Sequence, residues 1–374
     1  MKNKISYITL LSFFFQFGCA QENPPMIENP SKINYSFEIV VDGIDIPWGM
    51  AFINANEFLV TEQSGTLYYV NNGQKKVISG LPTVYFRGQG GLLDVALHPN
   101  FSENKIIYMT LGANIESDKN GGNTSLYCGT LNGTNLTDIK LLYKATPNSK
   151  KGQHWGSRIV FDKEGHIYFS IGDRGNRDVN PQDINRDGGK VYRLNLDGSI
   201  PNDNPFVDQS RAKTAIFSYG HRNPQGMTFN PITGQIWENE HGPQGGDEIN
   251  IIQKGVNYGW PKITYGINYS GTPITNQTSS PDMAQPFYYW VPSIAPSGMA
   301  FSTSNIYEGW KNNLFVGSLK FEYLERLIIE NNKVVKREKV LDKIGRVRNV
   351  VEGPDGFLYI AVEGKGILKI IPEK

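Results

Sequence analysis

The sequence predicts an all-β protein, a six-bladed β-propeller built from four-stranded antiparallel blades. Two observations carry this prediction: a strand–turn–strand motif recurs six times, and no amphipathic helical pattern of three turns interrupts it. One four-stranded sheet cannot bury both of its faces alone, so six such sheets are expected to stack around a common axis. An array of β-sandwiches with two cores fits the repeats less well.

The repeated motif is a short apolar strand, a tight turn and a second apolar strand. Lys163-Glu164-Gly165, Thr233-Gly234 and Pro354-Asp355-Gly356 supply the clearest turns. Equivalent positions in successive copies are 45 to 72 residues apart, at Phe52, Leu97, Phe161, Phe229, Phe301 and Val351. The longer spacings predict loops on one face of the propeller, which is where a functional site is expected.

The two ends of the chain are expected to meet in one blade. The last copy of the motif supplies only three strands, at 345–351, 357–362 and 366–371. A spare strand, Ser36–Val41, lies near the other end of the chain. We expect it to complete the last blade and close the ring, which removes an exposed sheet edge. The propeller domain is therefore assigned to residues 35–374.

The first residues predict export rather than a folded element. Residues 1–18 read as a signal peptide, with Lys2 and Lys4 before an apolar run of 13 residues, Ile5–Phe17. Gly18-Cys19 resembles the lipobox of bacterial lipoproteins, which implies a lipid on Cys19; ordinary cleavage near Ala20 is the alternative. Residues 19–34 contain three prolines and predict an extended tether. The protein is expected in the periplasm, or anchored to a membrane facing the periplasm or the exterior.

Charge and cysteine content exclude several classes of protein. Lys and Arg number 37 and Asp and Glu 36, so no basic excess indicates nucleic-acid binding. Two cysteines in 374 residues exclude a disulfide-stapled scaffold. Cys128 is expected to be a small buried hydrophobe. We expect a monomer or a dimer whose contact with a membrane is limited to the lipid on Cys19.

Polar residues without an evident packing role gather beside the repeated strands. Four cations would suit a ligand with several carboxylates: Arg222, Lys320, Arg346 and Arg348. His154 could accept a proton near neutral pH, and the Gly242-Pro243 turn offers backbone carbonyls, which calcium prefers. A polyanionic cofactor, a base and a hard cation indicate a redox or a hydrolytic site. Plainer interpretations stay open: a solvated strand face for Arg346 and Arg348, a structural role for His154, and turn stabilisation for Asp173.

Four segments resemble a known family. They are HWGSRIVFDKEGHIYFSIGD (154–173), SYGHRNPQGMTFNP (218–231), NEHGPQGGDEINIIQKGVNYGWP (239–261) and PSGMAF (296–301). They resemble the soluble aldose sugar dehydrogenases of the glucose/sorbosone dehydrogenase family, over about residues 35–372. The resemblance implies a six-bladed propeller that uses pyrroloquinoline quinone and calcium.

The resemblance also implies a role for each matching residue. His154 matches the general base at the sugar C1 hydroxyl and a cofactor contact, and Asp173 matches an acid near that base. Arg222 and Asn223 match the pair beside the quinone carbonyl that receives the hydride. The remaining cofactor contacts match Gln89, Lys320, Arg346 and Arg348. Calcium ligands match the backbone carbonyls of Gly242 and Pro243; the acidic pair Asp247 and Glu248 follows, as candidate ligands of a second calcium.

The implied reaction is oxidation of an aldose at C1 to an aldonolactone, with electrons passed on to an external acceptor. Gln153 stands where the soluble glucose dehydrogenase branch has an acid, and the loops that shape the sugar pocket look short, so sugar preference stays open. Two alternatives remain. A calcium-dependent sugar lactonase would need acidic metal ligands on the axis, and a cofactor-free extracellular binding propeller would have no use for a base beside a polyanion cradle.

Overall fold

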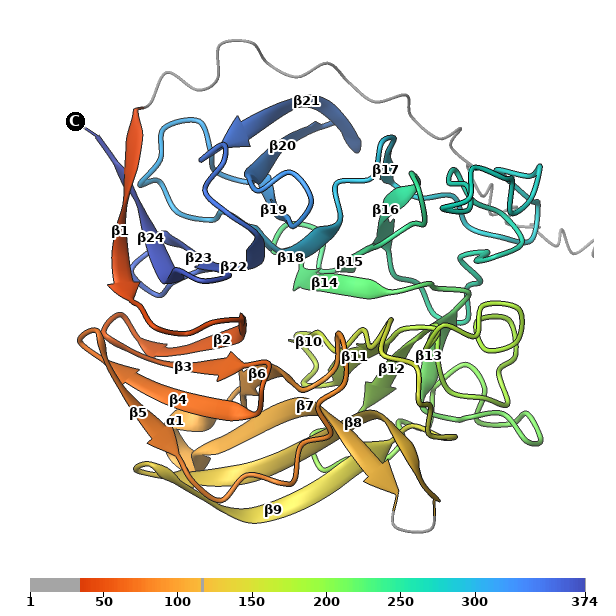
Figure 1. Cartoon of the computed structure of the whole chain (residues 1–374), viewed down its shortest axis with the longest axis horizontal. Helices are drawn as coiled ribbons and strands as arrows, with labels where there is room; N and C mark the ends of the chain where they lie inside the picture. The colour runs from red at the N-terminus through yellow and green to blue at the C-terminus, as the bar shows by residue number, and fades with distance from the viewer. Residues whose placement is uncertain (1–33, 116–117, 374) are drawn as a thin grey trace, which may run out of the picture.

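A computed structural model describes residues 34–115 and 118–373. Six four-stranded antiparallel sheets radiate from a common axis (Figure 1), which confirms the predicted six-bladed propeller. The described residues contain a single helix, the one-turn α1 (Phe101–Asn104). No helix in these ranges is long and apolar enough to cross a membrane.

Each of the first five blades runs in chain order from an inner strand at the axis to an outer strand at the rim. Blade 1 contains β2 (Pro47–Asn54), β3 (Glu57–Glu62), β4 (Thr66–Asn71) and β5 (Gln74–Ile78), and blade 2 contains β6 (Leu92–Leu97), β7 (Ile106–Ile115), β8 (Asp118–Asn132) and β9 (Asn135–Lys144). Blade 3 contains β10 (Ile159–Phe161), β11 (Ile167–Ile171), β12 (Lys190–Leu194) and β13 (Ile216–Tyr219). Blade 4 contains β14 (Pro224–Phe229), β15 (Ile236–Glu240), β16 (Asp247–Ile251) and β17 (Tyr288–Trp290). Blade 5 contains β18 (Pro296–Phe301), β19 (Leu314–Ser318), β20 (Leu324–Glu330) and β21 (Lys333–Val340).

Blade 6 joins both ends of the described chain. Its strands β22 (Val347–Glu352), β23 (Leu358–Val362) and β24 (Gly366–Pro372) come from the C-terminal part, and β1 (Tyr35–Val41) forms its outer edge. β1 pairs antiparallel with β24, from Tyr35 opposite Pro372 to Val41 opposite Ile367. Figure 1 shows β1 beside β24, near the C-terminus. The predicted closure of the ring is confirmed.

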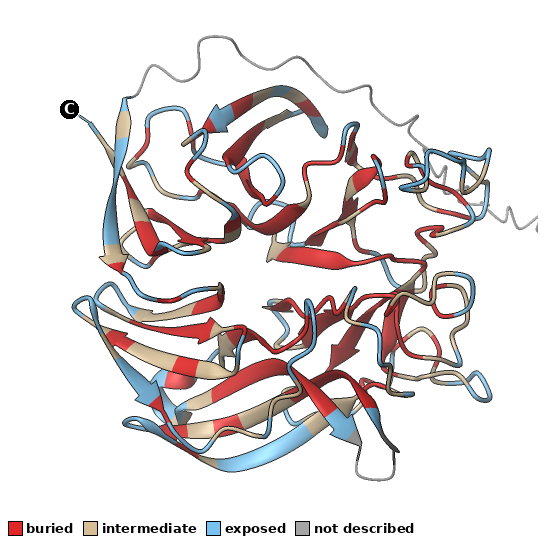
Figure 2. Cartoon of the chain, in the orientation of Figure 1, coloured by how far each residue is buried: buried red, intermediate tan, exposed pale blue. Residues whose placement is uncertain are grey.

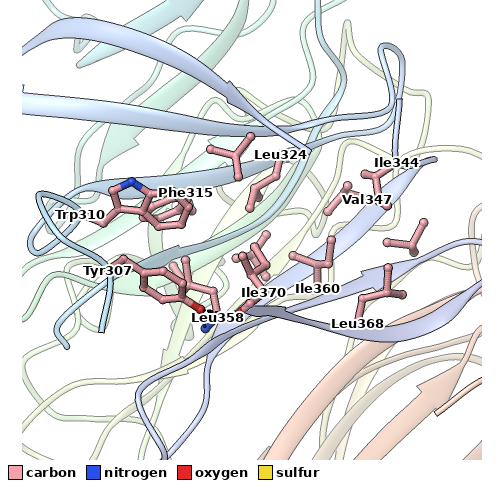
Figure 3. Close-up of a cluster of buried hydrophobic side chains, with 14 residues drawn as sticks. Tyr307, Trp310, Phe315, Leu324, Ile344, Val347, Leu358, Ile360, Leu368 and Ile370 are labelled. Carbon is pink, nitrogen blue, oxygen red and sulfur yellow. Dashed lines mark hydrogen bonds between the residues drawn. The ribbon is translucent and has the colours of Figure 1, made fainter. Parts of the chain in front are cut away.

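Apolar side chains fill the spaces between neighbouring blades. Figure 3 shows the cluster between blades 5 and 6, where Trp310, Phe315 and Leu324 face Ile360 and Leu368. These side chains are buried, and burying each one contributes about 1.5–3 kcal/mol. Figure 2 shows that burial is greatest in the inner and middle strands and that exposed residues concentrate at the rim. Stacking of the blades therefore provides the core that no single blade has.

Antiparallel pairing brings distant loops to one end of the axis. The inner strands all start at this end, so the loops that precede them meet those between the second and third strands of each blade. We call this end the site face; its loops include 42–46, 63–65, 79–91, 145–158, 172–189, 220–223, 241–246, 291–295, 319–323, 341–346 and 363–365. The long connection between β16 and β17 also returns here, because the Trp260 N–H donates to the Gly220 carbonyl at 2.8 Å.

Candidate functional site

His154 lies in the loop that enters β10 and has a left-handed backbone, with φ of 58°. Such a backbone costs about 1–2 kcal/mol in a residue with a Cβ and persists where neighbours hold it. The Gln89 side-chain oxygen accepts the His154 backbone N–H at 2.8 Å, and the next residue, Trp155, is buried. A Cβ on Gly90 would lie 2.2 Å from the Trp155 indole, so only glycine fits there. The loop therefore fixes where the imidazole lies.

Asp173, directly after β11, holds the His154 imidazole. The Nδ1 atom of His154 lies 2.6 Å from the Asp173 Oδ1 atom, and Asp173 also accepts the Trp260 indole N–H at 2.9 Å and the Gly175 N–H at 2.7 Å. Burial opposes ionisation of Asp173, but the bond and charge of His154, the Arg222 charge and the Trp260 bond outweigh it and lower its pKa. Burial lowers the pKa of His154, and the Arg222 charge adds to this against the raising effect of Asp173. The arrangement favours a neutral imidazole beside an ionised carboxylate.

Arg222 and Asn223 enter β14 with their backbone fixed by one carboxylate. Glu240 Oε2 accepts the backbone N–H groups of both residues, with the Asn223 bond at 3.2 Å. The Arg222 guanidinium donates to the His241 carbonyl at 2.9 Å and lies 5.4 Å from the Trp260 ring. Within the described residues, Arg222 Nε and Asn223 Nδ2 are buried donors without an acceptor. A ligand with carbonyl oxygens at this place would satisfy them.

Behind this pair lies a polar cluster of four buried residues, His221, Glu238, Glu240 and Asn250, and half-buried Glu248. The Nδ1 atom of His221 lies 3.1 Å from Glu238 and 3.2 Å from Glu240. Burial opposes the His221 charge, yet these two glutamates raise its pKa to about 9. Burial and the charge of Glu240 raise the pKa of Glu248 well above its usual range. The cluster supports the Arg222–Asn223 backbone from behind.

The Gly242–Pro243 turn is held by Asp247, the first residue of β16. Asp247 accepts the Gly242 N–H at 2.7 Å, the Ser293 hydroxyl at 2.8 Å and the Ala295 N–H at 2.8 Å. Burial raises the pKa of Asp247 to about 6. Its oxygens therefore serve the turn, while neighbouring Glu248 contacts Asn250 within the buried cluster. The turn presents carbonyl oxygens of the kind that a hard cation binds.

The three remaining cations lie on blades 5 and 6. Arg346 and Arg348 both pair with Glu363; the Arg346 Nε to Glu363 Oε2 distance is 2.6 Å. Arg346 also donates to the carbonyl of Leu319 at 2.9 Å, next to Lys320. Lys320 is exposed, and none of the described acids forms an ion pair with it. One acid thus offsets part of the positive charge predicted here.

A cavity of about 290 Å³ opens between the site-face loops of blades 3 and 4. His154, Asp173, Arg222, Pro243 and Trp260 all line it, together with Lys151, Gln153, Gly175, Asn176, Arg177, Asp178, Asn268 and Tyr269. A larger cavity of about 450 Å³ lies at the opposite ends of the inner strands, and its lining is polar and apolar in about equal measure. We place the candidate site in the smaller cavity, because His154, Asp173 and Arg222 meet there; Lys320, Arg346 and Arg348 lie outside its lining.

The structure thus brings His154, Asp173 and Arg222 to one cavity, with Pro243 at its wall. Burial lowers the pKa of half-buried His241, and the charges of Arg222 and Arg348 add to this effect. Sequence reasoning missed Trp260, Glu240 and Glu363. Trp260 and Glu240 occur within the motif at 239–261, whereas Glu363 had no signal beyond its place after a predicted strand.

Comparison with known proteins gives a consistent result. A family model described as glucose/sorbosone dehydrogenase matches residues 44–369. The chain is 40% identical to aldose sugar dehydrogenase YliI of Escherichia coli over 92% of this chain and 94% of that one. It is 27% identical to quinoprotein glucose dehydrogenase B of Acinetobacter calcoaceticus, over 92% and 88% of the two chains.

Solved structures agree with the fold. The crystal structure of soluble aldose sugar dehydrogenase from Escherichia coli in the apo-form superposes with a TM-score of 0.87, at 39% identity over 91% of this chain and all of that one. The structure of the PQQ-bound aldose sugar dehydrogenase from Streptomyces coelicolor gives 0.73, at 24% identity over 94% of this chain and all of that one. At that identity, the second match shows the fold.

Proposed function

Because the chain belongs to the glucose/sorbosone dehydrogenase family, we propose that it oxidises aldose sugars at C1 to aldonolactones, using pyrroloquinoline quinone and calcium. One observation carries the proposal: His154, Asp173 and Arg222 line a single cavity beside the Gly242–Pro243 turn. The activity of the similar aldose sugar dehydrogenase and quinoprotein glucose dehydrogenase supports it.

The residues present suit such a cofactor. Arg222 Nε and Asn223 Nδ2 are buried donors without a partner among the described residues, and carbonyl oxygens would accept from them. Lys320, Arg346 and Arg348 would bind carboxylates, and Gln89, which holds the His154 backbone N–H, would add a further polar contact. The carbonyls of Gly242 and Pro243 would hold calcium. When bound, the quinone supplies the hydride acceptor and calcium supplies positive charge beside its oxygens.

His154 acts as the base. Ionised Asp173 accepts a hydrogen bond from the protonated Nδ1 atom, so the Nε2 atom carries the free lone pair. Nε2 then takes the proton of the sugar C1 hydroxyl as the C1–H hydride leaves. The lowered pKa keeps the imidazole unprotonated at neutral pH. Gln89 holds the His154 backbone and Asp173 holds its ring before the sugar arrives.

Arg222 stabilises negative charge that develops on a ligand oxygen. Its position is fixed in advance by Glu240 through the backbone and by the His241 carbonyl through the side chain. A donor that is already oriented stabilises charge without reorganising during the reaction. Arg222 therefore stabilises negative charge on the acceptor, and His154 removes the proton from the sugar.

One assay tests this proposal against its alternatives. Apoprotein is mixed with pyrroloquinoline quinone and calcium, then with aldoses and an artificial electron acceptor. Reduction of the acceptor supports the proposal, and no reduction with any aldose would eliminate it. Lactone hydrolysis would instead support a lactonase. The structure favours that alternative less, because Asp94, an acid that lines the larger cavity, is paired with Arg158 at 3.0 Å instead of being free to bind a metal ion.

We further propose that the protein is exported, carries a lipid on Cys19 and passes its electrons to an external acceptor. Residues 1–18 and 19–34, assigned to a signal peptide and a tether, are almost entirely outside the described residues. Incorporation of a labelled fatty acid that is lost in Cys19→Ser would support the anchor. We also propose Glu248 as a ligand of a second calcium, which calcium counting in Glu248→Gln would test.

A further inference from the structure

We propose that Trp260 is a positioning residue that tunes the basicity of His154 through Asp173 and holds the Arg222 guanidinium at the cofactor face. This inference rests on the proposed function. It concerns a side chain from the long β16–β17 connection, which contacts both halves of the reaction machinery.

The first contact is with the base. The Trp260 indole N–H donates to Asp173 Oδ2 at 2.9 Å, while Asp173 Oδ1 lies 2.6 Å from His154 Nδ1. Asp173 is only 1% exposed, so water cannot readily replace a lost donor. The positive end of the Trp260 N–H dipole disfavours added positive charge on the His154–Asp173 pair. Removing it should therefore raise the pKa of His154.

The second contact is with the charge-stabilising group. The guanidinium carbon of Arg222 lies 5.4 Å from the centre of a Trp260 ring, within the range of a cation–π interaction. Trp260 also lines the candidate cavity with Arg222 and His154. One indole thus contacts Arg222 through its ring and Asp173 through its N–H.

The backbone around Trp260 is well fixed. Its N–H donates to the Gly220 carbonyl at 2.8 Å, and its carbonyl accepts from Gln182 at 2.8 Å. The neighbouring Tyr258 N–H donates to the Tyr219 carbonyl at 2.8 Å. These bonds join the connection to the loops of blade 3 that carry Asp173 and Arg222. The indole therefore has the support that a positioning residue needs.

Other charged groups also affect the pKa values of the His154–Asp173 pair. The charges of Arg222 and Arg174 lower the pKa of His154, and a proton on His154 would in turn lower the pKa of His241. The Asp173 charge likewise acts on Lys190. The substitutions proposed below leave all of these groups in place, so a change in titration reports on the indole.

The test compares Trp260→Phe with Trp290→Phe. Trp290 is a matched control, because its indole N–H donates to buried Glu325 at 2.8 Å within the core between blades 4 and 5. The measurement is an NMR pH titration of His154 in the apoprotein, with its signal identified from His154→Gln among the five histidines. We expect Trp260→Phe to raise the pKa of His154 by about 0.5–1 unit and Trp290→Phe to leave it unchanged.

An unchanged His154 titration in folded Trp260→Phe, or an equal shift in Trp290→Phe, would overturn the proposal. If Trp260→Phe does not fold, benzothienylalanine at position 260 removes the N–H and keeps the ring shape. Trp260→Leu, which also lacks the ring, should weaken quinone binding about 3- to 10-fold more than Trp260→Phe does. Equal binding by the two variants would refute the Arg222 part. The titration needs no turnover, so it is decided even if no sugar is oxidised.

Discussion

The imidazole of His154 and the carboxylate of Asp173 form a hydrogen-bonded pair with a 2.6 Å separation between Nδ1 and Oδ1. Asp173→Asn removes the charge that fixes the Nδ1 proton, so we expect kcat to fall about 10²-fold or more. Asp173 raises the pKa of His154, so its loss lowers that pKa further. The acid limb of the pH profile should then move to lower pH while the plateau falls.

A second histidine–aspartate pair provides the control for this experiment. His166 Nδ1 lies 2.8 Å from Asp162 Oδ2 in the turn between β10 and β11, at the opposite end of the axis. Asp162→Asn should leave kcat and the acid limb unchanged. If both variants lose activity equally, Asp173 has only a structural role.

Replacing the base should separate binding from turnover. His154→Ala removes the atom that takes the sugar proton but leaves Arg222, Lys320 and the Gly242–Pro243 turn, so quinone affinity should stay nearly intact. Turnover should fall by about 10²–10⁴-fold. Quinone titration of the apoprotein and steady-state kinetics measure the two effects. Near-normal turnover would refute the assignment of the base.

Calcium affinity should depend on Asp247 although its oxygens bond to the protein. Asp247→Asn replaces one acceptor oxygen with a donor and leaves an N–H of Gly242 or Ala295 without its partner. We expect the calcium concentration for half-maximal reconstitution to rise about 10-fold or more, which corresponds to about 1.4 kcal/mol. Asp355→Asn, in the turn between β22 and β23, is the control. An unchanged calcium requirement would exclude this role.

Charge arithmetic at Arg346, Arg348 and Glu363 gives predictions of opposite sign. Two guanidinium groups and one carboxylate leave a local charge of 2 − 1 = +1. Arg348→Gln makes it zero and should weaken quinone binding about 10-fold, whereas Glu363→Gln makes it +2 and should tighten binding at low salt. Titrations at two salt concentrations measure both. A change in the same direction for the two variants would contradict an electrostatic role.

The fold was largely predictable from the sequence because each blade repeats the same local pattern. Alternating apolar residues and turn glycines locate strands such as β11 and β23, and the missing fourth strand of the last copy indicated that Ser36–Val41 closes the ring. Local patterns of this kind depend on neighbouring residues only.

The site was harder to predict because its partners come from different blades. His154 and Arg222 carry recognisable motifs, but the Trp260–Asp173 bond joins residues 87 positions apart. The pairing of Glu363 with Arg346 and Arg348 depends on the register between two strands, because the start of β22 lies opposite the end of β23. The spacing of apolar residues along the sequence does not indicate such contacts. The charge balance of the site and its hydrogen-bond partners therefore became apparent only in the three-dimensional structure.

The pairing of β1 with β24 also has a consequence for biosynthesis. The first strand of the propeller to leave the ribosome has no partner until the last has been made, so the ring stays open throughout translation. A product truncated before β24 would lack that partner and leave an unpaired sheet edge, on which quality-control proteases could act. The ring therefore closes only once β24 has been made.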